Sequence, residues 1–362
     1  MKNYFRYQFK KFLLPLTVLF LFAIIMYVIP LAAENYKYWN FQFDQEFTSE
    51  MHKPTYIDLY TDEILTALAI MCVVMPIYAF SYKMNKRSVD TYYSVPLTKT
   101  KLAAVHFIVG FVTVIAAFSA AYLLGFIVIV AKVKGLRLIF YLWIYLASLI
   151  PAFCIYTITA FFYTRANTVV DGIIFVLFGY CLFGIIVLAA DHISNSAGSI
   201  EWGDWSYYFA PSPLAVVSNG LQKCIYDANE VYSWSYISRD KVVAINELAG
   251  CLTVTVMAIA CTLGLFFTEK HSNAENCGQI SESIFGYKSM IPIYTVSIFI
   301  SLSFSPEVVQ SSVIAWCAIA FCAFIMTVIY KRTLKIGKKA LLLLSLSIAV
   351  GLIAGITIVS IY

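Results

Sequence analysis

The sequence predicts an all-α polytopic integral membrane protein with about nine transmembrane helices. Hydrophobic residues make up 61% of the chain and charged residues only 12%, whereas soluble domains carry about 25% charged residues. Nine apolar runs follow one another, and most reach the roughly 20 residues that a helix needs to cross the hydrocarbon core. The basic residues are concentrated in every second segment between the runs, as the positive-inside rule requires.

The apolar runs predict the membrane-spanning helices. They are 12–33, 64–82, 102–131, 138–164, 168–190, 242–268, 289–304, 308–330 and 340–361. Run 102–131 is 30 residues long, so its helix must tilt or extend beyond the bilayer. Run 289–304 has 16 residues and contains Pro292. Without it, the basic cluster 331–339 would fall on the outer side.

The charges predict the orientation. If the segments between runs alternate and the first lies inside, the inside segments hold 17 of the 25 Lys and Arg residues, and the outside segments hold 14 of the 20 Asp and Glu residues. This distribution predicts a multi-pass cell-membrane protein with a cytoplasmic N-terminus and an extracellular C-terminus. The net charge of +5 then reflects orientation and contact with lipid headgroups, not nucleic-acid binding. Run 12–33 lacks a cleavage pattern and is expected to be retained.

No catalytic signature is present in the sequence. The nine cysteines contain no C-x-x-C pair, so neither a zinc site nor a redox pair is indicated. The motifs G-x-x-x-x-G-K-[ST], H-E-x-x-H and G-x-S-x-G are also missing, and these would mark nucleotide, zinc and serine chemistry. The chain is therefore expected to be non-catalytic and to bind no cofactor or metal.

Residues 1–11 alternate basic and aromatic side chains. On a helix, Phe5, Phe9 and Phe12 would share one face, as in an amphipathic elbow helix on the inner leaflet. A simple positive-inside signal is the alternative.

The basic inner loop 83–101 predicts a short cytoplasmic helix. Ser88 is expected to cap it, Pro96 to end it after about Val95, and Thr98 or Thr100 to cap the following helix. Its exposed side would present Asp90, Tyr92 and Tyr93. Such a helix suits docking to a partner protein, and an ordinary topogenic loop is the alternative.

Small residues recur every four positions in two runs. They are Thr113, Ala117, Ala121 and Gly125 in one run, and Gly351 and Gly355 in another. Ridges of this kind allow close packing of membrane helices.

Three polar residues in the runs are candidate sites, because ionisable groups in membrane helices are often functional. Asp171 lies near the inner end of its run, six residues after Arg165. It suggests a gate or a headgroup contact, and pairing with Arg165 is the favoured role. Glu247 would extend outward or line a cavity, and His106 is expected to be a packed or interfacial histidine.

Two long outer loops, 34–63 and 191–241, are rich in aromatic residues. The second contains an amphipathic stretch at 213–226 and predicts a helical hairpin at the outer interface.

This order of parts resembles a bacterial ABC-2-type permease, the membrane subunit of an ABC transporter. The family has an elbow helix, here 1–11, and a coupling helix between spans two and three. The string from Arg87 to Lys99 resembles the family's ending Leu/Val-Pro-Leu-Ser/Thr-Lys/Arg, and 191–241 resembles its extracellular hairpin with Pro211-Ser-Pro-Leu. Residues 12–268 would form the six-span core. The cytoplasmic loop 269–288 and the three-span extension 289–362 are similar to longer Firmicutes Ytr-like permeases, with Phe267 to Gly278 a partial match.

The resemblance implies the function of a permease. A separate ATPase subunit would bind ATP and Mg²⁺, a second permease would complete a homo- or heterodimer, and transport would be export of an unidentified substrate. The implied coupling residues are Arg87, Asp90, Tyr92, Tyr93, Pro96 and Lys99, and the possible gate or transport path includes Arg165, Asp171 and Glu247. A self-contained secondary carrier or a polytopic membrane enzyme is the alternative. A carrier would show inverted repeats and interrupted helices.

Overall fold

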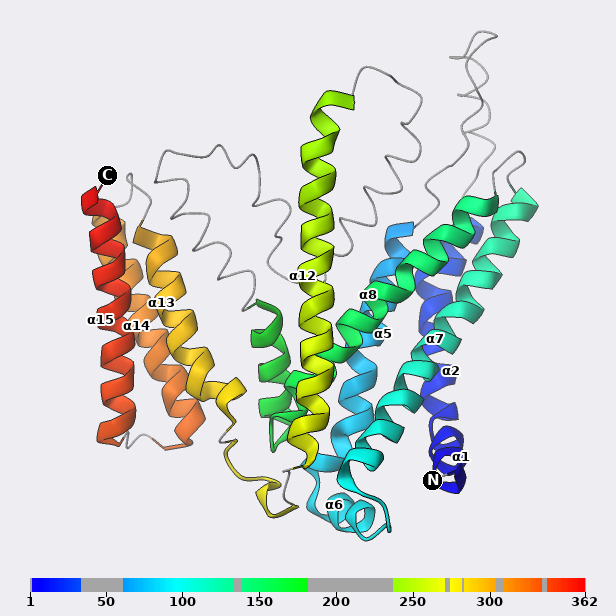
Figure 1. Cartoon of the computed structure of the whole chain (residues 1–362), viewed down its shortest axis with the longest axis horizontal. Coiled ribbons are helices and arrows are strands. Elements are labelled where there is room, and N and C mark those ends of the chain that lie inside the picture. The colour runs from blue at the N-terminus through cyan, green and yellow to red at the C-terminus, as the bar shows by residue number, and fades with distance from the viewer. Residues whose placement is uncertain are drawn as a thin grey trace. The chain divides into compact units, whose positions relative to one another are not determined.

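The computed structural model describes residues 2–33, 61–132, 138–181, 237–270, 274–281, 283–303, 309–333 and 337–361. These residues form helices and turns with no strand, as Figure 1 shows. The all-α class predicted from composition is therefore confirmed for this part of the chain.

Helices occupy the described part of every predicted run. The bounds are α1 Lys2–Lys11, α2 Leu13–Ala23, η1 Ile24–Val28, α3 Ile29–Ala33, α5 Thr61–Phe80, η2 Ser81–Met84, α6 Lys86–Tyr93, α7 Lys99–Lys132, α8 Leu138–Thr164, Val169–Cys181, α12 Ile237–Lys270, η3 Ala274–Asn276, η4 Ile284–Lys288, α13 Ser289–Ser303, α14 Val309–Lys331 and α15 Lys338–Ile361. The short run forms α13, with Pro292 as its fourth residue, near the helix start.

Four helical stretches of the described residues are long and apolar enough to cross a membrane. They are Leu13–Ala33, Glu63–Met84, Lys99–Lys132 and Ile144–Thr164. Val169–Cys181 and Trp316–Lys331 are shorter apolar helices. A membrane protein is thus supported, and the count of nine spans and the orientation stay predictions.

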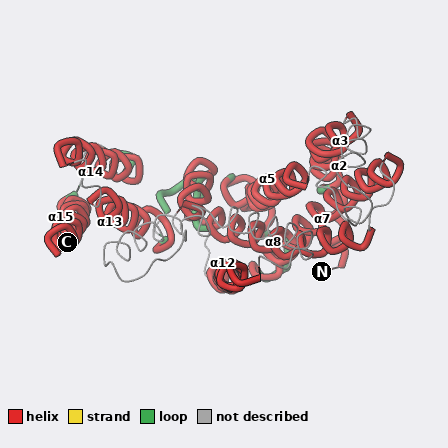
Figure 2. The backbone as a smooth tube through the Cα atoms, turned by 90° about the horizontal axis from the view of Figure 1, so that it is seen from above, coloured by secondary structure: helices red, strands yellow, loops and turns green. Residues whose placement is uncertain are grey.

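The chain divides into two compact units. The first comprises Met1–Phe80, Pro96–Ala160 and Val217–His271, and the second comprises Ser81–Val95, Phe161–Val216 and Ser272–Tyr362. In the first unit, α7 packs against α1, α2, α5 and α12. In the second unit, α13 lies beside both α14 and α15 (Figure 2).

Small residues create the closest helix contacts, as their spacing predicted. Thr113, Ala117, Ala121 and Gly125 are all buried along α7. A Cβ atom on Gly125 would lie 2.1 Å from the Tyr27 ring, so only glycine allows this ring to pack against α7. In the second unit, a Cβ atom on Gly351 would lie 2.8 Å from Phe299 Cβ. The surroundings of Gly355 lie outside the described side chains.

The N-terminal segment forms helix α1, and its role as an elbow on the inner leaflet stays a prediction. Gln8 and Phe12 are buried, whereas Phe9 is 37% exposed. Tyr4 and Gln8 turn to α7, where the Tyr4 hydroxyl lies 3.0 Å from His106 Nε2 and Gln8 Nε2 donates to Tyr4 Oη. This polar contact, which aromatic spacing does not indicate, sets the rotation of α1. His106 is buried and packed, as predicted.

The predicted outer loops fall outside the described residues over 34–60 and 191–236. The expected outer hairpin is therefore a prediction that the structure does not address.

Candidate functional site

The short helix predicted in loop 83–101 is α6, and its cytoplasmic location stays a prediction. Its N-cap is Asn85, whose side-chain oxygen accepts a hydrogen bond from the Arg87 N–H at 3.1 Å. The prediction that Ser88 caps the helix is therefore wrong, because Asn85 offers an acceptor three residues earlier. The helix ends at Tyr93, before Pro96 as expected. In the first unit, Thr98 caps α7 and accepts from the Lys101 N–H.

The exposed side of α6 is charged. Val89 is buried at 3% exposure, while Arg87 and Asp90 are exposed. Tyr92 and Tyr93 are only half-buried, not outward as predicted. The Tyr92 ring packs against Tyr82, with the ring centroids 4.8 Å apart. Of the other predicted coupling residues, Pro96 is exposed and Lys99 is the first residue of α7, both in the first unit.

The loop that contains η3 and Gly278 also packs on α6, although nothing in the sequence predicted it. η3 contacts α6, and a Cβ atom on Gly278 would lie 3.8 Å from Lys86 Cε. Cys277 is buried here, and burial raises the pKa of its thiol, an effect that Lys86 opposes and Asp90 reinforces. The two loops therefore form one surface within the second unit.

Gly278 connects this surface to the helices. Its φ of 79° is in the left-handed region, where glycine is favoured. The Gly278 N–H donates to the Asn167 carbonyl at 2.9 Å, and its own carbonyl lies 3.5 Å from Arg332 Nη1. The loop is thus held between the start of helix Val169–Cys181 and the end of α14.

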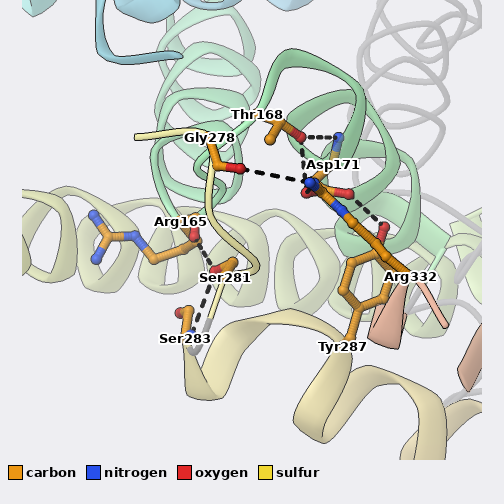
Figure 3. A network of polar contacts seen from close by, with 8 residues as sticks. All are labelled: Arg165, Thr168, Asp171, Gly278, Ser281, Ser283, Tyr287 and Arg332. Carbon is orange, nitrogen blue, oxygen red and sulfur yellow. Dashed lines mark hydrogen bonds and ion pairs between the residues drawn. The ribbon is translucent and has the colours of Figure 1, made fainter. Parts of the chain in front are cut away.

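Four side chains meet beside Gly278 and form what we call the Asp171 cluster (Figure 3). They are Thr168, Asp171, Tyr287 and Arg332. The Asp171 carboxylate accepts from Arg332 Nη2 at 2.9 Å, from the Thr168 hydroxyl at 2.7 Å and from the Tyr287 hydroxyl at 3.0 Å. The Asp171 side chain is 10% exposed and that of Arg332 is 45% exposed. A nearly buried carboxylate is stable here because a cation and two hydroxyl donors replace water.

Local sequence explains why Asp171 faces this way. Thr168 is the N-cap of its helix, and its hydroxyl oxygen accepts from the Asp171 N–H at 3.2 Å. A carboxylate three residues after a threonine cap also interacts favourably with the N-terminal helix dipole. Burial and the adjacent Asp171 raise the pKa of Tyr287 above its ordinary value of 10.0, so it remains a donor. The pattern Thr-x-x-Asp before an apolar run is the signal that could have identified this cap.

The predicted pairing of Asp171 with Arg165 is wrong. The Arg165 guanidinium points away from Asp171 (Figure 3). Its Nη2 donates to Thr164 Oγ1 at 3.2 Å, and its carbonyl accepts from the Ser281 hydroxyl at 2.6 Å. Helix α8 ends at Thr164, so Arg165 lies in the turn before the helix that carries Asp171, and the two side chains diverge. Glu247 lies in α12, and its side chain is outside the described ones.

The Asp171 cluster has the chemistry of a structural contact that connects several helices. Asp171 is held by Thr168 at the start of its own helix, by Tyr287 of η4 and by Arg332 just after α14. In the described part of the chain, no group of three or more His, Cys, Asp and Glu side chains has the geometry to hold a metal ion. The cluster and α6 are linked through Gly278 by contacts of a single unit.

Comparison with known proteins adds no assignment to this geometry. No protein-family model, curated protein or solved structure matches the chain.

Proposed function

We propose that this chain is the membrane-spanning permease subunit of an ABC transporter of the ABC-2 type, driven by a separate ATPase subunit. The observation that carries the proposal is α6, a capped helix of eight residues between two long apolar helices. Its apolar side is buried and its outward side carries Arg87 and Asp90. A helix held in this way offers fixed charges for docking to a cytoplasmic partner.

The Asp171 cluster supports a route for force through the second unit. A movement of α6 reaches Gly278 through η3 and Lys86, and Gly278 contacts the Arg332 guanidinium. Arg332 is paired with Asp171 at the start of another helix. Force applied by a partner at α6 would therefore reach the ends of α14 and of helix Val169–Cys181, because rigid elements in contact can carry coupling.

The ATPase would bind ATP and Mg²⁺, and a second permease, identical or homologous, would complete the dimer. Each chain offers one α6 and thus one docking position. Export of an unidentified substrate follows from the resemblance to the family. The alternative is a self-contained carrier, which needs a membrane carboxylate free to exchange partners. Asp171 is a poor candidate for that role because three donors hold it.

Charge reversal on α6 tests the proposal. The tagged chain is purified from native membranes, and a P-loop ATPase with ATP hydrolysis is expected to copurify. Arg87→Glu combined with Asp90→Lys should weaken its retention by about 2 kcal/mol or more, as expected for contacts at the centre of an interface. Both side chains are exposed, so these changes spare the packing of the chain, unlike Tyr92→Ala, which removes the contact with Tyr82.

Lys338→Glu with Lys339→Glu is the matched control, because both residues are exposed at the start of α15. It should retain the ATPase fully. Copurification of no ATPase, or equal retention by the α6 variant, would refute the docking role.

A further inference from the structure

Helix α6 is too small to hold a protein partner by itself. It has eight residues, so it is roughly 12 Å long at a rise of 1.5 Å per residue. Lys86, Arg87, Asp90 and Thr91 are exposed on it. A stable interface takes about 800 Å² and roughly 20–30 residues from each partner. A protein that docks on α6 must therefore also cover neighbouring parts of the chain.

Two short elements of the second unit, η2 and η3, lie against α6. They differ in what they present to a partner. η2 directly precedes α6, and its residues are buried or half-buried. η3 belongs to the loop after α12, and its residues Glu275 and Asn276 are exposed, as is Gln279 shortly after it. The exposed surface of α6 therefore continues onto η3.

The contact with α6 fixes the exposed residues of η3 in place. Cys277 is only 4% exposed, so the chain turns inward directly after Asn276. A Cβ atom on Gly278 would lie 3.8 Å from Lys86 Cε, which shows how closely the loop approaches α6. Glu275 and Asn276 are therefore held beside α6 before any partner arrives. Such preorganisation favours binding, because little conformational freedom remains to be lost.

The charges of this surface are balanced. α6 contributes Lys86, Arg87 and Asp90, and η3 contributes Glu275, all of them exposed. Anionic lipid attracts clusters of basic residues, and the two acidic side chains oppose that attraction. A folded protein with charges of both signs can match the pattern, and complementary pairs then fix its orientation. The chemistry of the surface thus favours a protein partner over lipid.

We infer that the ATPase proposed to dock on α6 covers η3 as well, with a basic side chain opposite Glu275. This inference rests on the proposed function and adds a second contact, which the resemblance to the family does not imply. An ATPase on both elements holds the segment before α7 and the segment after α12 at the same time. One movement of the ATPase would then act on both segments.

Site-specific cross-linking tests the composite surface in native membranes. The photoreactive residue p-benzoylphenylalanine is placed in the full tagged chain at Thr91, at Asn276 or at Lys338, and mass spectrometry identifies the products. Thr91 reports docking on α6, and Asn276 reports contact with η3. Lys338, exposed at the start of α15, is the control. Asn276 should yield the same P-loop ATPase as Thr91, and Lys338 should yield none.

The three positions separate this inference from the proposed function. An ATPase product at Thr91 without one at Asn276 would overturn the composite surface and leave docking on α6 intact. Absence of an ATPase product at both positions would refute the docking role of α6 as well. A phospholipid product at Asn276 in place of the ATPase, or an equal ATPase product at Lys338, would also overturn the composite surface.

Charge changes at Glu275 test its pairing with the ATPase. Glu275→Lys should lower retention of the copurified ATPase about fivefold at low salt, because it places like charges opposite each other. Glu275→Gln should lower retention less, and Glu275→Asp should keep it. The loss should shrink at high salt, since ions screen exposed pairs.

Gly337→Lys is the matched control for the added positive charge. Gly337 is exposed, and a Cβ atom added there would meet no other atom within 4 Å. This variant should retain the ATPase fully. Equal retention by Glu275→Lys and the wild type, or a loss that salt does not change, would overturn the pairing at Glu275.

Discussion

Arg332 has an unfavourable backbone conformation, but its side chain makes favourable contacts. Its φ of 52° is positive, which in the described residues is found at no other non-glycine position. The left-handed conformation costs a residue with a Cβ atom about 1–2 kcal/mol, and glycine is the usual residue just after a helix. The side chain offsets this cost, because it binds Asp171 and contacts the Gly278 carbonyl. The backbone turn is what directs the guanidinium to the carboxylate.

Two substitutions at Arg332 separate these effects. Arg332→Ala should lower the free energy of unfolding by about 2 kcal/mol, less than the 3–5 kcal/mol typical of a fully buried pair, because the Arg332 side chain is 45% exposed. Arg332→Gly loses the same ion pair but relieves the backbone, so it should be about 1 kcal/mol more stable than Arg332→Ala. Thermal unfolding of the purified variants in one detergent measures both.

Arg332→Lys is the control that keeps the positive charge, and it should lie between the wild type and Arg332→Ala. If alanine and glycine gave equal stability, the backbone would be unstrained. If neither variant lost stability, the pair with Asp171 would contribute nothing.

At the scale of elements, α6 and η3 should respond together to charge changes. The Cys277 thiol reports on this contact, because burial raises its pKa above the ordinary value of 9.0, Lys86 opposes the shift and Asp90 adds to it. The thiolate is the reactive form, so alkylation of Cys277 by iodoacetamide should rise with pH to a midpoint above 9.0. Lys86→Gln should move this midpoint higher, and Asp90→Asn should move it lower. Mass spectrometry of the Cys277 peptide follows the reaction in the full chain.

Lys338→Gln removes a positive charge at the exposed start of α15 and should leave the Cys277 midpoint unchanged. A midpoint at the ordinary thiol value, or shifts of the opposite sign, would mean that η3 does not pack on α6.

Local patterns predicted the helices and some of their ends well. These patterns act within a few residues or along one helix. They are the apolar runs, Pro96 after α6, Thr98 before α7 and the small residues of α7. The sequence did not reveal the partner of Asp171, since Arg332 is 161 positions away and the nearer Arg165 was the more obvious choice. The packing of Cys277 and Gly278 on α6 was missed for the same reason. A charge pattern shows that a partner is needed, but the fold decides which residue provides it.

At the scale of the whole molecule, the charge partition makes a prediction about topology. With nine spans, the two termini lie on opposite sides of the membrane. A reporter active only in the cytoplasm should work when fused before Met1 and fail when fused after Tyr362, because 17 of the 25 basic residues lie in segments of the N-terminal side. An active cytoplasmic reporter at both ends would remove one span, and run 289–304 would be the first to examine.

A reporter inserted at Gly337 is the internal control. Gly337 lies in the basic segment after α14, and a Cβ atom added there would meet no other atom within 4 Å. With nine spans this insertion should report the cytoplasm, whereas loss of run 289–304 would place it on the outer side and make the C-terminal fusion cytoplasmic.

The ion pair between Asp171 and Arg332 also has a consequence during synthesis of the protein. The two residues are 161 positions apart in the chain, and ribosomes add about 5–20 residues each second. The carboxylate is therefore synthesised roughly ten to thirty seconds before its guanidinium. During that interval the nascent chain carries an acidic group with only the neighbouring Thr168 hydroxyl to satisfy it, since Tyr287 is also made later. The ion pair thus forms only after α14 and Arg332 have been synthesised. A chain interrupted before that point would expose an unpaired acid by which quality control could recognise it.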